Sequence, residues 1–334
     1  MAQGGRDGRK PPRGGKAAGR PTRARPERGR TGTGHPGKSK SGAPASRGAR
    51  PAARPGVRPG PAKGIRGVDR ARTAYTTDHG IGGSQIEGRQ AVRELLIAQK
   101  RRVLEIWVSD EIEDNPVIDD IVDLASAQRV PLRRVKRKDI DRDARSEAPQ
   151  GILAKAEPIA EFDLAELLRD TKSPQFYVAV DGVTDPGNLG AILRCCDGAG
   201  VTAVVLPRHR AVHITPTAAK SAAGAAEYVP MCVVGGLPTA LKLMKDSGVW
   251  VIGLDDSADR SIFEMGSLAR ESVCVVLGAE GTGLSRLVRE RCDVLVSIPM
   301  FGALSSLNVS VATALATYEV VRARRAPDGR SAPE

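Results

Sequence analysis

The sequence predicts an α/β protein built around a parallel sheet. Short runs of Val, Leu and Ile, such as "FYVAV", "TAVVL" and "VCVVL", alternate with helical segments through the second half of the chain. Strands that are apolar throughout are buried on both faces, which is typical of parallel sheets with helices on each side. A shorter alternation precedes this one, and a basic segment opens the chain. With 334 residues, of which 40% are hydrophobic, the chain is long enough for more than one core.

The basic segment, residues 1–80, differs from the rest of the chain in charge. It carries 20 Lys and Arg against 4 Asp and Glu, which leaves 31 basic and 35 acidic residues elsewhere. It is rich in Gly and Pro and poor in large apolar side chains, so burial cannot offset the entropy lost on ordering. We expect residues 1–80 to be disordered, and likewise residues 326–334. An arginine-rich arm releases counterions when it meets phosphates, which predicts contact with nucleic acid; a solubility tail is the alternative.

The composition disfavours membrane proteins, disulfide-bonded proteins and metalloproteins. No stretch reaches the roughly 18 apolar residues of a membrane span and no apolar signal core follows Met1, so we expect a cytoplasmic protein without a membrane partner. The five cysteines are odd in number and lack a C-x-x-C pair, which indicates reduced core residues. His209 and His213 stand four apart, but no third ligand is apparent, and we expect no metal.

A small α/β domain is expected at residues 82–157, followed by a polar linker with one short helix at 158–173. Apolar periodicity predicts, in the order helix, strand, helix, strand, strand, the segments 88–99, 103–109, 116–128, 130–136 and 150–157. Basic residues gather at the loops and strand ends of this domain, in Lys100–Arg102, Arg133–Arg134 and Lys136–Lys138. This clustering favours an RNA-contacting face over ordinary solvated surface.

A larger domain is expected at residues 174–325, where strands and helices alternate. The predicted strands are 176–182, 202–206, 231–235, 249–255, 273–280 and 294–300. The predicted helices are 188–200, 217–229, 238–248, 283–292 and a last helix that ends near Arg325. Parallel sheets of this kind bind ligands beyond the carboxyl ends of their strands. Three loops of unusual composition follow strands there.

The first two of these loops combine glycine with polar residues. In "DGVTDPGNLGAILR" a strand turns into a helix that carries Asn188 near its start and Arg194 nearly two turns on. In "LGAEGTGLS" the glycines Gly278, Gly281 and Gly283 allow a ligand to approach the backbone closely. The spacing is not the dinucleotide-binding fingerprint, which belongs on the first strand of its domain.

The third loop lies in "SIPMFGALSSLNVSVATALATYE" and places two serines and an asparagine before the last helix. A serine hydroxyl at the N-cap would accept from free N–H groups of the first turn, and this explains one of Ser305 and Ser306 but not the whole cluster with Asn308. The remaining side chains therefore predict a second role at this position.

The segments "DPGNLGAILR", "LGAEGTGLS" and "IPMFGALSSLNVSVATALATYE" resemble the three motifs of the SpoU/TrmH (SPOUT) class of RNA ribose 2'-O-methyltransferases. The resemblance covers residues 174–325, and the segment that opens with "IEGRQAVRELL" is similar to the ribosomal-protein-like substrate domain of RlmB-type members. Membership implies a deep C-terminal trefoil knot, although chains in general avoid knots. The element-by-element prediction alone gives an unknotted sheet.

The resemblance also implies a cofactor, S-adenosylmethionine, held in a bent form between the second and third loops. The adenine would lie against backbone at the apolar strand ends, and this suits a flat heterocycle. The cofactor-binding residues implied are Leu277, Gly278, Glu280, Gly281, Ile298, Met300, Leu307 and Asn308.

The catalytic residues that the resemblance implies are Arg194, Asn188, Ser306, Asn308 and Glu280. A ribose hydroxyl must lose its proton as it attacks the methyl carbon, so the site needs a proton acceptor and in-line positioning. The position of Arg194 is the proposed base, oriented by Asn188, while Ser306 polarises the hydroxyl and Glu280 braces the site. A guanidinium stays protonated in proteins, so orientation of the substrate or phosphate binding is an equal alternative for Arg194.

The partners implied are RNA and a second copy of the chain. The expected substrate is a guanosine of 23S ribosomal RNA or a large-subunit precursor, and the expected homodimer packs through the first-motif helix and the last helix. A transfer-RNA methylase and a methylase of ribosomal adenosine are alternatives within the class. A non-catalytic ribosome-assembly factor is the alternative outside it, but such a protein should have lost Asn188, Arg194 or Asn308, and all three are present.

Overall fold

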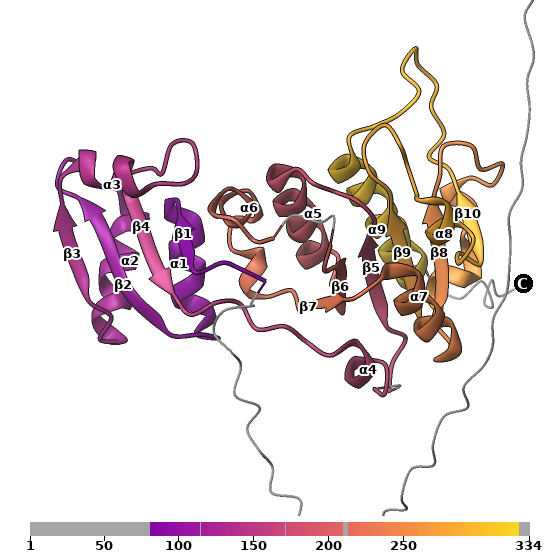
Figure 1. Cartoon of the computed structure of the whole chain (residues 1–334), viewed down its shortest axis with the longest axis horizontal. Coiled ribbons are helices and arrows are strands. Elements are labelled where there is room, and N and C mark those ends of the chain that lie inside the picture. Colours follow the sequence, from indigo (N-terminus) through magenta and orange to yellow (C-terminus); the bar gives the residue numbers. More distant parts are fainter. Residues whose placement is uncertain (1–80, 114, 171, 210–212, 327–334) are drawn as a thin grey trace, which may run out of the picture. The chain divides into compact units, whose positions relative to one another are not determined.

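The structure is a computed structural model that describes residues 81–113, 115–170, 172–209 and 213–326. The segment 1–80, expected to be disordered, lies outside the described residues, as do residues 327–334. The described part contains a small mixed sheet and a larger parallel sheet, each covered by helices (Figure 1). The predicted α/β class with a parallel sheet is therefore confirmed.

The small sheet has four strands in the order β1-β4-β2-β3, with β2 and β3 parallel and the other two pairs antiparallel. Its elements are β1 (Gln85–Glu87), α1 (Arg89–Ala98), β2 (Val103–Ser109), α2 (Pro116–Ala127), β3 (Leu132–Val135), α3 (Arg137–Asp143) and β4 (Ile152–Ala156). The apolar faces of α1 and α2 contribute Val92, Leu95, Leu96 and Ile121 to one core with the strands.

Two of these elements were not expected from the sequence. Strand β1 has only three residues, too few to display an alternating pattern. Helix α3 reads "RKDIDRD" and buries only Ile140, so its apolar periodicity is almost absent. Its N-terminal neighbours Arg133, Arg134 and Lys136 are exposed together with Arg137 and Lys138, as a phosphate-contacting face requires.

The larger sheet is parallel throughout, with the strand order β10-β8-β9-β5-β6-β7. Its strands are β5 (Phe176–Val180), β6 (Ala203–Pro207), β7 (Met231–Val234), β8 (Trp250–Leu254), β9 (Val273–Leu277) and β10 (Val294–Val296). The helices are α4 (Leu164–Leu167), α5 (Pro186–Gly198), α6 (Pro216–Ala222), α7 (Leu237–Asp246), α8 (Arg286–Arg289) and α9 (Val309–Arg325). Short 3₁₀ turns lie at Ala225–Glu227, Ile262–Glu264 and Gly266–Arg270.

Alternate residues of the central strand β5 enter two different cores. Phe176, Val178 and Val180 face the core that includes α5, α6 and α9, while Tyr177 and Ala179 face the core that includes α4, α7 and α8. Both faces of the sheet are therefore covered, which explains why its strands are apolar throughout. Helices α5 and α9 lie next to each other on the first face (Figure 1).

Two predicted helices are shorter than the sequence suggested. The expected helix at 217–229 ends at Ala222, because Ala223 and Gly224 both adopt left-handed conformations, with φ of 50° and 99°. A Cβ at Gly224 would stand 2.3 Å from the Cβ of Glu94, so the chain turns where α1 of the small domain approaches. The expected helix at 283–292 is only one turn, α8, because the preceding residues form a hairpin-like loop.

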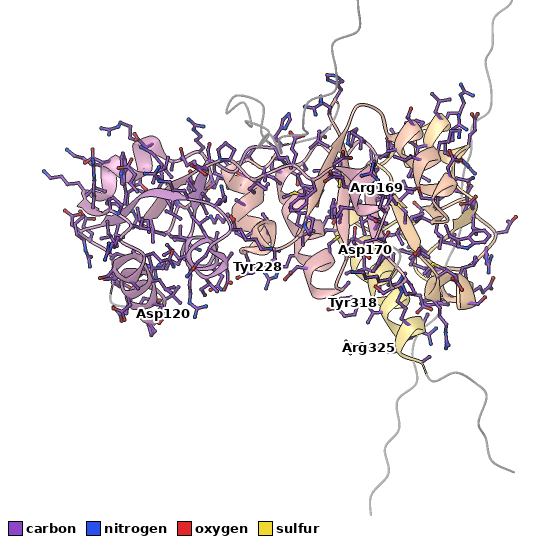
Figure 2. The ribbon with its side chains drawn as sticks, turned by 90° about the horizontal axis from the view of Figure 1, so that it is seen from below. Asp120, Arg169, Asp170, Tyr228, Tyr318 and Arg325 are labelled. Carbon is purple, nitrogen blue, oxygen red and sulfur yellow. The ribbon has the colours of Figure 1, made fainter. Side chains whose placement is uncertain are left out.

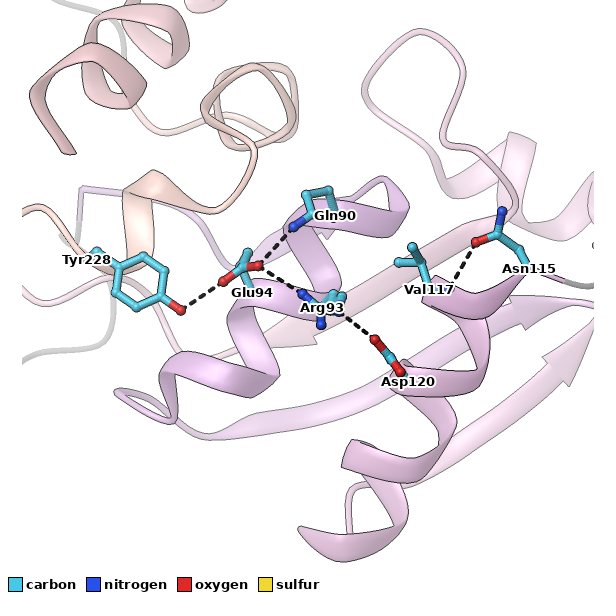
Figure 3. A network of polar contacts seen from close by, with 7 residues as sticks. All are labelled: Gln90, Arg93, Glu94, Asn115, Val117, Asp120 and Tyr228. Atoms are coloured by element: carbon cyan, nitrogen blue, oxygen red, sulfur yellow. Dashed lines mark hydrogen bonds and ion pairs between the residues drawn. The ribbon is translucent and has the colours of Figure 1, made fainter. Parts of the chain in front are cut away.

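Polar side chains connect α1 and its following loop with the 3₁₀ turn at Ala225–Glu227. Arg101 donates through Nε to Glu227 Oε2 at 2.8 Å, and its other nitrogens bond Glu227 Oε1 and two backbone carbonyls. The side chains of Arg101 and Glu227 are only 7% and 5% exposed. The hydroxyl of Tyr228 donates to Glu94, which also accepts from Gln90 and Arg93 (Figure 3). The expectation that Arg101 contacts phosphate is therefore wrong, because its guanidinium is buried in an ion pair.

All five cysteines are free thiols, of which Cys196, Cys232 and Cys274 are buried and the other two half-buried. Burial raises the pKa of every one of these thiols, to about 12 for Cys232 and Cys292. They are therefore protonated at neutral pH. Within the described ranges no helix has the length and apolarity to cross a membrane, and no three His, Cys, Asp or Glu side chains gather as a metal site would need.

Candidate functional site

A cavity of about 700 Å³ opens at the carboxyl ends of β8, β9 and β10. Its walls come from the ends of these strands, the loop after β9 and the loop between β10 and α9. The lining residues are Leu254–Ser257, Leu277–Leu284, Arg289, Val296, Ile298, Met300, Ser305–Val309 and Ala312. Cavities of about 300–1,000 Å³ accommodate ligands of drug or cofactor size.

The loop after β9 forms one wall because it folds back on itself. Ala279 and Gly283 exchange backbone hydrogen bonds at 3.0 and 2.9 Å, so the loop closes as a tight hairpin. A Cβ on Gly278 would stand 2.3 Å from the carbonyl carbon of Gly283, and no side chain fits there. The N–H of Ser285 donates to Asp181 Oδ2 at 2.7 Å, which ties the end of the loop to the residue after β5. The backbone of this wall is therefore held in a fixed shape.

The loop between β10 and α9 supplies the opposite wall and ends in a capped helix. Asn308 is the N-cap of α9, and its Oδ1 accepts from the N–H of Ser310 at 2.9 Å and from its hydroxyl. Ser306 is exposed and lines the cavity. Phe301, one residue beyond the lining residue Met300, is 95% exposed. The expectation of a serine cap is therefore wrong, because the capping residue is the asparagine, and both serines are available for other contacts.

Three side chains from three loops meet at the edge of this cavity in a polar triangle. Asn188, in the first turn of α5, donates through Nδ2 to Glu280 Oε1 at 3.0 Å. Asn308 donates through Nδ2 to Asn188 Oδ1 at 2.9 Å and to the same Glu280 oxygen at 2.8 Å. Asn188 is itself positioned because Asp185, the N-cap of α5, accepts from its backbone N–H at 2.7 Å. The structure therefore brings together one residue from each of the three sequence motifs.

The hydrogen bonds of this triangle leave specific atoms available. Both amide hydrogens of Asn308 and its Oδ1 are used, whereas Asn188 Nδ2 retains one hydrogen and Glu280 Oε2 has no partner in the described part of the chain. Asn308 is fixed, and Asn188 and Glu280 can still bind a ligand. One donor and one carboxylate oxygen are suited to hold a hydroxyl group.

The sequence-predicted site residues divide into two groups. All eight expected cofactor-binding residues line the one cavity, and so does Ser306. Asn188 is outside the lining and reaches it through Glu280. Arg194 lies farther along α5, is exposed, and has no hydrogen bond or ion pair to any described residue. The structure therefore leaves its guanidinium free for a ligand that approaches from solvent.

A second polar group in the cavity wall was not expected from the sequence. Asp255, directly after β8, accepts at Oδ1 from the N–H of Ser257 at 3.0 Å and from its hydroxyl at 2.6 Å. Arg289 of α8 bonds Asp255 Oδ2 through Nη1 at 3.2 Å and Ser257 Oγ through Nη2 at 2.9 Å. The signal was present, because Asp255 ends the predicted strand "VWVIGLD" at the carboxyl edge of the sheet.

These walls fit S-adenosylmethionine in size and in chemistry. Bare backbone around Gly278 and the apolar side chains of Leu277, Ile298 and Leu307 offer a slot for a flat heterocycle. The polar triangle and the Asp255–Ser257–Arg289 group offer partners for hydroxyl and charged groups. No cysteine side chain lines the cavity in the described structure, and the raised pKa values of the thiols argue against a cysteine nucleophile.

Two family models match the chain. Residues 175–318 match the model of the SpoU rRNA Methylase family. Residues 85–162 match a model described as RNA 2'-O ribose methyltransferase substrate binding. The first match contains all three loops of the site, and the second contains the whole small sheet.

Curated relatives and solved structures resemble the chain over most of its described length. The 23S rRNA (guanosine-2'-O-)-methyltransferase RlmB of Pseudomonas putida is 40% identical over 244 residues, which cover 72% of this chain and 97% of that protein. The RlmB of Escherichia coli is 38% identical over 242 residues, covering 72% and 98%. The SpoU methyltransferase AviRb from Streptomyces viridochromogenes, solved with AdoMet, has the same fold, with a TM-score of 0.61, 24% identity and coverage of 72% and 89%.

Proposed function

Because the chain belongs to the SpoU rRNA methylase family, we propose that it transfers a methyl group from S-adenosylmethionine to a ribose 2'-hydroxyl of RNA. The substrate is a guanosine of 23S ribosomal RNA, as the names of the RlmB relatives state for those proteins. The observation that carries the proposal is the polar triangle of Asn188, Glu280 and Asn308 at the edge of the cavity.

The cavity would hold the cofactor between the two loop walls. Backbone of Leu277, Gly278, Ile298 and Leu307 and the side chain of Met300 would hold its adenine. Gly281 keeps the turn of the first wall open to the ligand. When bound, S-adenosylmethionine supplies a methyl group on a positively charged sulfur.

The chain contributes positioning and charge to the reaction. Glu280 and the fixed Asn308 hold Asn188 so that its free amide hydrogen can orient the target hydroxyl, while Ser306 polarises it. Since a guanidinium cannot give up its proton in a protein, Arg194 binds the substrate phosphate and Glu280 Oε2 is the available proton acceptor. This assignment departs from the role of base that the family resemblance implies for Arg194.

A methylation assay with separate binding measurements tests the proposal. Wild-type protein should bind S-adenosylmethionine in calorimetry and place 2'-O-methyl groups on 23S RNA, with the position read by mapping. Arg194→Ala should retain its affinity for the cofactor and lose methyl transfer. Arg194→Lys should recover part of the methyl transfer, because a cation is restored. If the wild-type protein does not bind the cofactor, the proposal is wrong. If methyl groups are found only on transfer RNA, the substrate is transfer RNA and not 23S RNA.

RNA contacts are assigned to the exposed basic residues around β3 and α3 of the small domain. Residues Arg133, Arg134, Lys136, Arg137 and Lys138 lie there without burial. The match of this domain to a substrate-binding family model supports the assignment. The tail before residue 81, outside the described residues, adds further positive charge.

A homodimer is the proposed assembly, packed through α5 and α9. Val311, Leu315 and Tyr318 are 47%, 42% and 53% exposed and recur along one side of α9, where Figure 2 labels Tyr318. An exposed apolar stripe of this kind is typical of an interface. Leu315→Glu should shift the mass measured by light scattering from dimer to monomer, and an unchanged mass argues against this surface.

The trefoil knot is the proposed topology of the C-terminal segment. The segment that joins β8 to β9 contacts both the residue after β10 and the last helix. The backbone N–H of Ile262 donates to the carbonyl oxygen of Ser297 at 2.8 Å, and the turn Gly266–Arg270 packs on α9. This arrangement supports a chain that passes through the β8–β9 connection. The cytoplasm is the proposed location, because that is where the 23S RNA named for the relatives is assembled.

A further inference from the structure

The Asp255–Ser257–Arg289 group lines the cavity at the carboxyl end of β8. Asp255 follows β8, whereas Glu280 follows β9, and β9 separates β8 from β5 in the sheet. The cavity therefore has two polar ends. One holds the carboxylate of Glu280 with two asparagine amides, and the other holds a guanidinium.

The guanidinium at the β8 end is fixed in place. Arg289 forms two bonds, one to Asp255 and one to Ser257, and Ser257 in turn donates to Asp255. The Asp255 side chain is 8% exposed, while that of Arg289 is 45% exposed and lines the cavity. The carboxylate thus acts as a buried support that orients an accessible cation.

The groups that remain free to form hydrogen bonds at this end are mostly donors. Of the five N–H groups of Arg289, one donates to Ser257 and a second nitrogen is paired with Asp255, so donors remain available. Asp255 accepts two hydrogen bonds at Oδ1, and its Oδ2 is paired with Arg289. A ligand group that meets this surface must be an acceptor, and a guanidinium binds carboxylates best, through two parallel hydrogen bonds.

A free carboxylate belongs to the residue that follows Asp255 in the chain. Asp256 lines the cavity, is exposed, and has no hydrogen bond or ion pair to another residue in the described ranges. A cation and an anion on adjacent parts of one wall are complementary to a zwitterionic α-amino acid. The remaining charge, Glu280, is at the other end and suits a positive centre.

We infer that Arg289, supported by Asp255 and Ser257, binds the α-carboxylate of S-adenosylmethionine, and that Asp256 binds its α-ammonium group. The inference deepens the proposed function and depends on it for the identity of the cofactor. It assigns the amino-acid part of the cofactor to the β8 side and leaves the sulfonium near Glu280. Phosphate binding from the RNA is the competing role for Arg289.

The test compares three ligands that share the adenosine part. S-Adenosylmethionine and S-adenosylhomocysteine carry the amino-acid group, and 5'-methylthioadenosine lacks it. In calorimetry on the full chain, Arg289→Gln should lower the affinity for S-adenosylmethionine and for S-adenosylhomocysteine by about tenfold to a hundredfold. This is the effect expected for a lost hydrogen bond between charged groups. Affinity for 5'-methylthioadenosine should remain unchanged, which also shows that the pocket is intact. Asp256→Asn should weaken the same two ligands.

Arg286→Gln is the matched control. Arg286 lies on the same helix, its side chain is 78% exposed, it pairs with Glu290, and it is outside the cavity lining. This variant should bind all three ligands as the wild type does.

Three results overturn the inference. If Arg289→Gln lowers the affinity for all three ligands equally, the residue contacts or shapes the adenosine site. Unchanged affinity for all three means that it contacts none of them. Unchanged cofactor affinity with weaker RNA binding assigns Arg289 to phosphate. A wild-type chain that binds none of the three ligands contradicts the proposed function itself, and the two failures are thereby distinguished.

Discussion

Asn308 performs two separate tasks in one side chain. Its Oδ1 caps α9, and its Nδ2 joins Asn188 to Glu280. The helix start and the polar edge of the cavity are thus fixed by the same residue. A change at this position should affect both stability and activity, and the two effects can be separated.

Asn308→Ala should abolish methyl transfer and also cost about 0.5–2 kcal/mol of stability through loss of the cap. Asn115→Ala is the control, because Asn115 caps α2 in the same way, accepting from Val117 N–H at 3.0 Å (Figure 3), and is remote from the cavity. Both variants should unfold at similarly lowered urea concentrations, but only Asn308→Ala should be inactive. Equal activity in the two variants would show that the triangle is not required.

The raised pKa values of the buried thiols predict how stability changes in alkali. Burial raises the pKa of Cys232 to about 12, whereas an unfolded cysteine ionises near its usual value of about 8.5. Between these values the folded thiol keeps a proton that the unfolded chain releases. Its contribution to stability is therefore complete below pH 8.5 and is lost as the pH rises toward 12.

Cys232→Ala should make the stability less dependent on pH in this range. Removing one such thiol should reduce the slope by up to about 1.4 kcal/mol per pH unit. Urea unfolding at pH 8, 9 and 10 measures the slope for the wild type and the variant. Identical slopes would contradict the assigned burial effect.

Helix packing sets the position of the first motif at the scale of elements. Helix α5 carries Asn188 and Arg194 and packs closely on α6 and α9. At the contact with α6, a Cβ on Gly190 would stand 2.4 Å from the carbonyl oxygen of Ala218. The backbone of α5 at Gly190 therefore lies against the backbone of α6, and no larger residue fits without displacement.

Gly190→Ala should destabilise the protein by about 1–3 kcal/mol, the usual cost of overpacking a core. Gly235→Ala is the control, since no atom lies within 4 Å of its added Cβ and its φ is not positive. The midpoint of urea unfolding should fall for the first variant alone. A midpoint unchanged in Gly190→Ala would mean that α6 can shift at little cost.

The elements that the sequence predicted well are those with a strong apolar pattern. The strands of the larger sheet, such as "FYVAV" and "VCVVL", are buried on both faces, so nearly every residue in them is apolar. Helix α3 and strand β1 bury too little to show a period. The end of α6 was missed because a left-handed Ala223 has no signature in composition.

The site was predictable to the extent that its loops carry motifs. The glycine-rich loop and the "SSLN" segment stand out in the sequence, and both line the cavity. Arg289 and Asp255 come from an ordinary helix turn and an ordinary strand end, 34 positions apart in sequence numbering. Only folding brings them within 3.2 Å, so no local pattern could pair them.

At the scale of the whole described structure, the ion pair between Arg101 and Glu227 connects the small sheet to the larger one. Both side chains are almost fully buried, and Arg101 also bonds two backbone carbonyls. Breaking a buried pair leaves an uncompensated charge and costs more than the pair itself contributes. The small domain is thus held by an interaction that is costly to disrupt on one side only.

Arg101→Met should lower the stability by about 3–5 kcal/mol, because Glu227 remains buried without a partner. Replacing both residues by apolar ones should recover much of that loss. Arg142→Met is the surface control: Arg142 pairs with Asp139 with side chains 68% and 32% exposed, so its loss should cost about 0–1 kcal/mol. Thermal unfolding of the variants measures the difference, and equal effects of Arg101→Met and Arg142→Met would contradict the buried pair.

The cavity draws its walls from residues 254–312, and this has a consequence during synthesis. A fragment that stops before α9 lacks the helix on which Asn308 and the loop between β10 and α9 are anchored, and it also lacks the lining residues Val309 and Ala312. A nascent chain thus stays catalytically silent until its last helix leaves the ribosome and docks beside α5. An enzyme proposed to modify ribosomal RNA would in this way be inert toward the particle that is translating it.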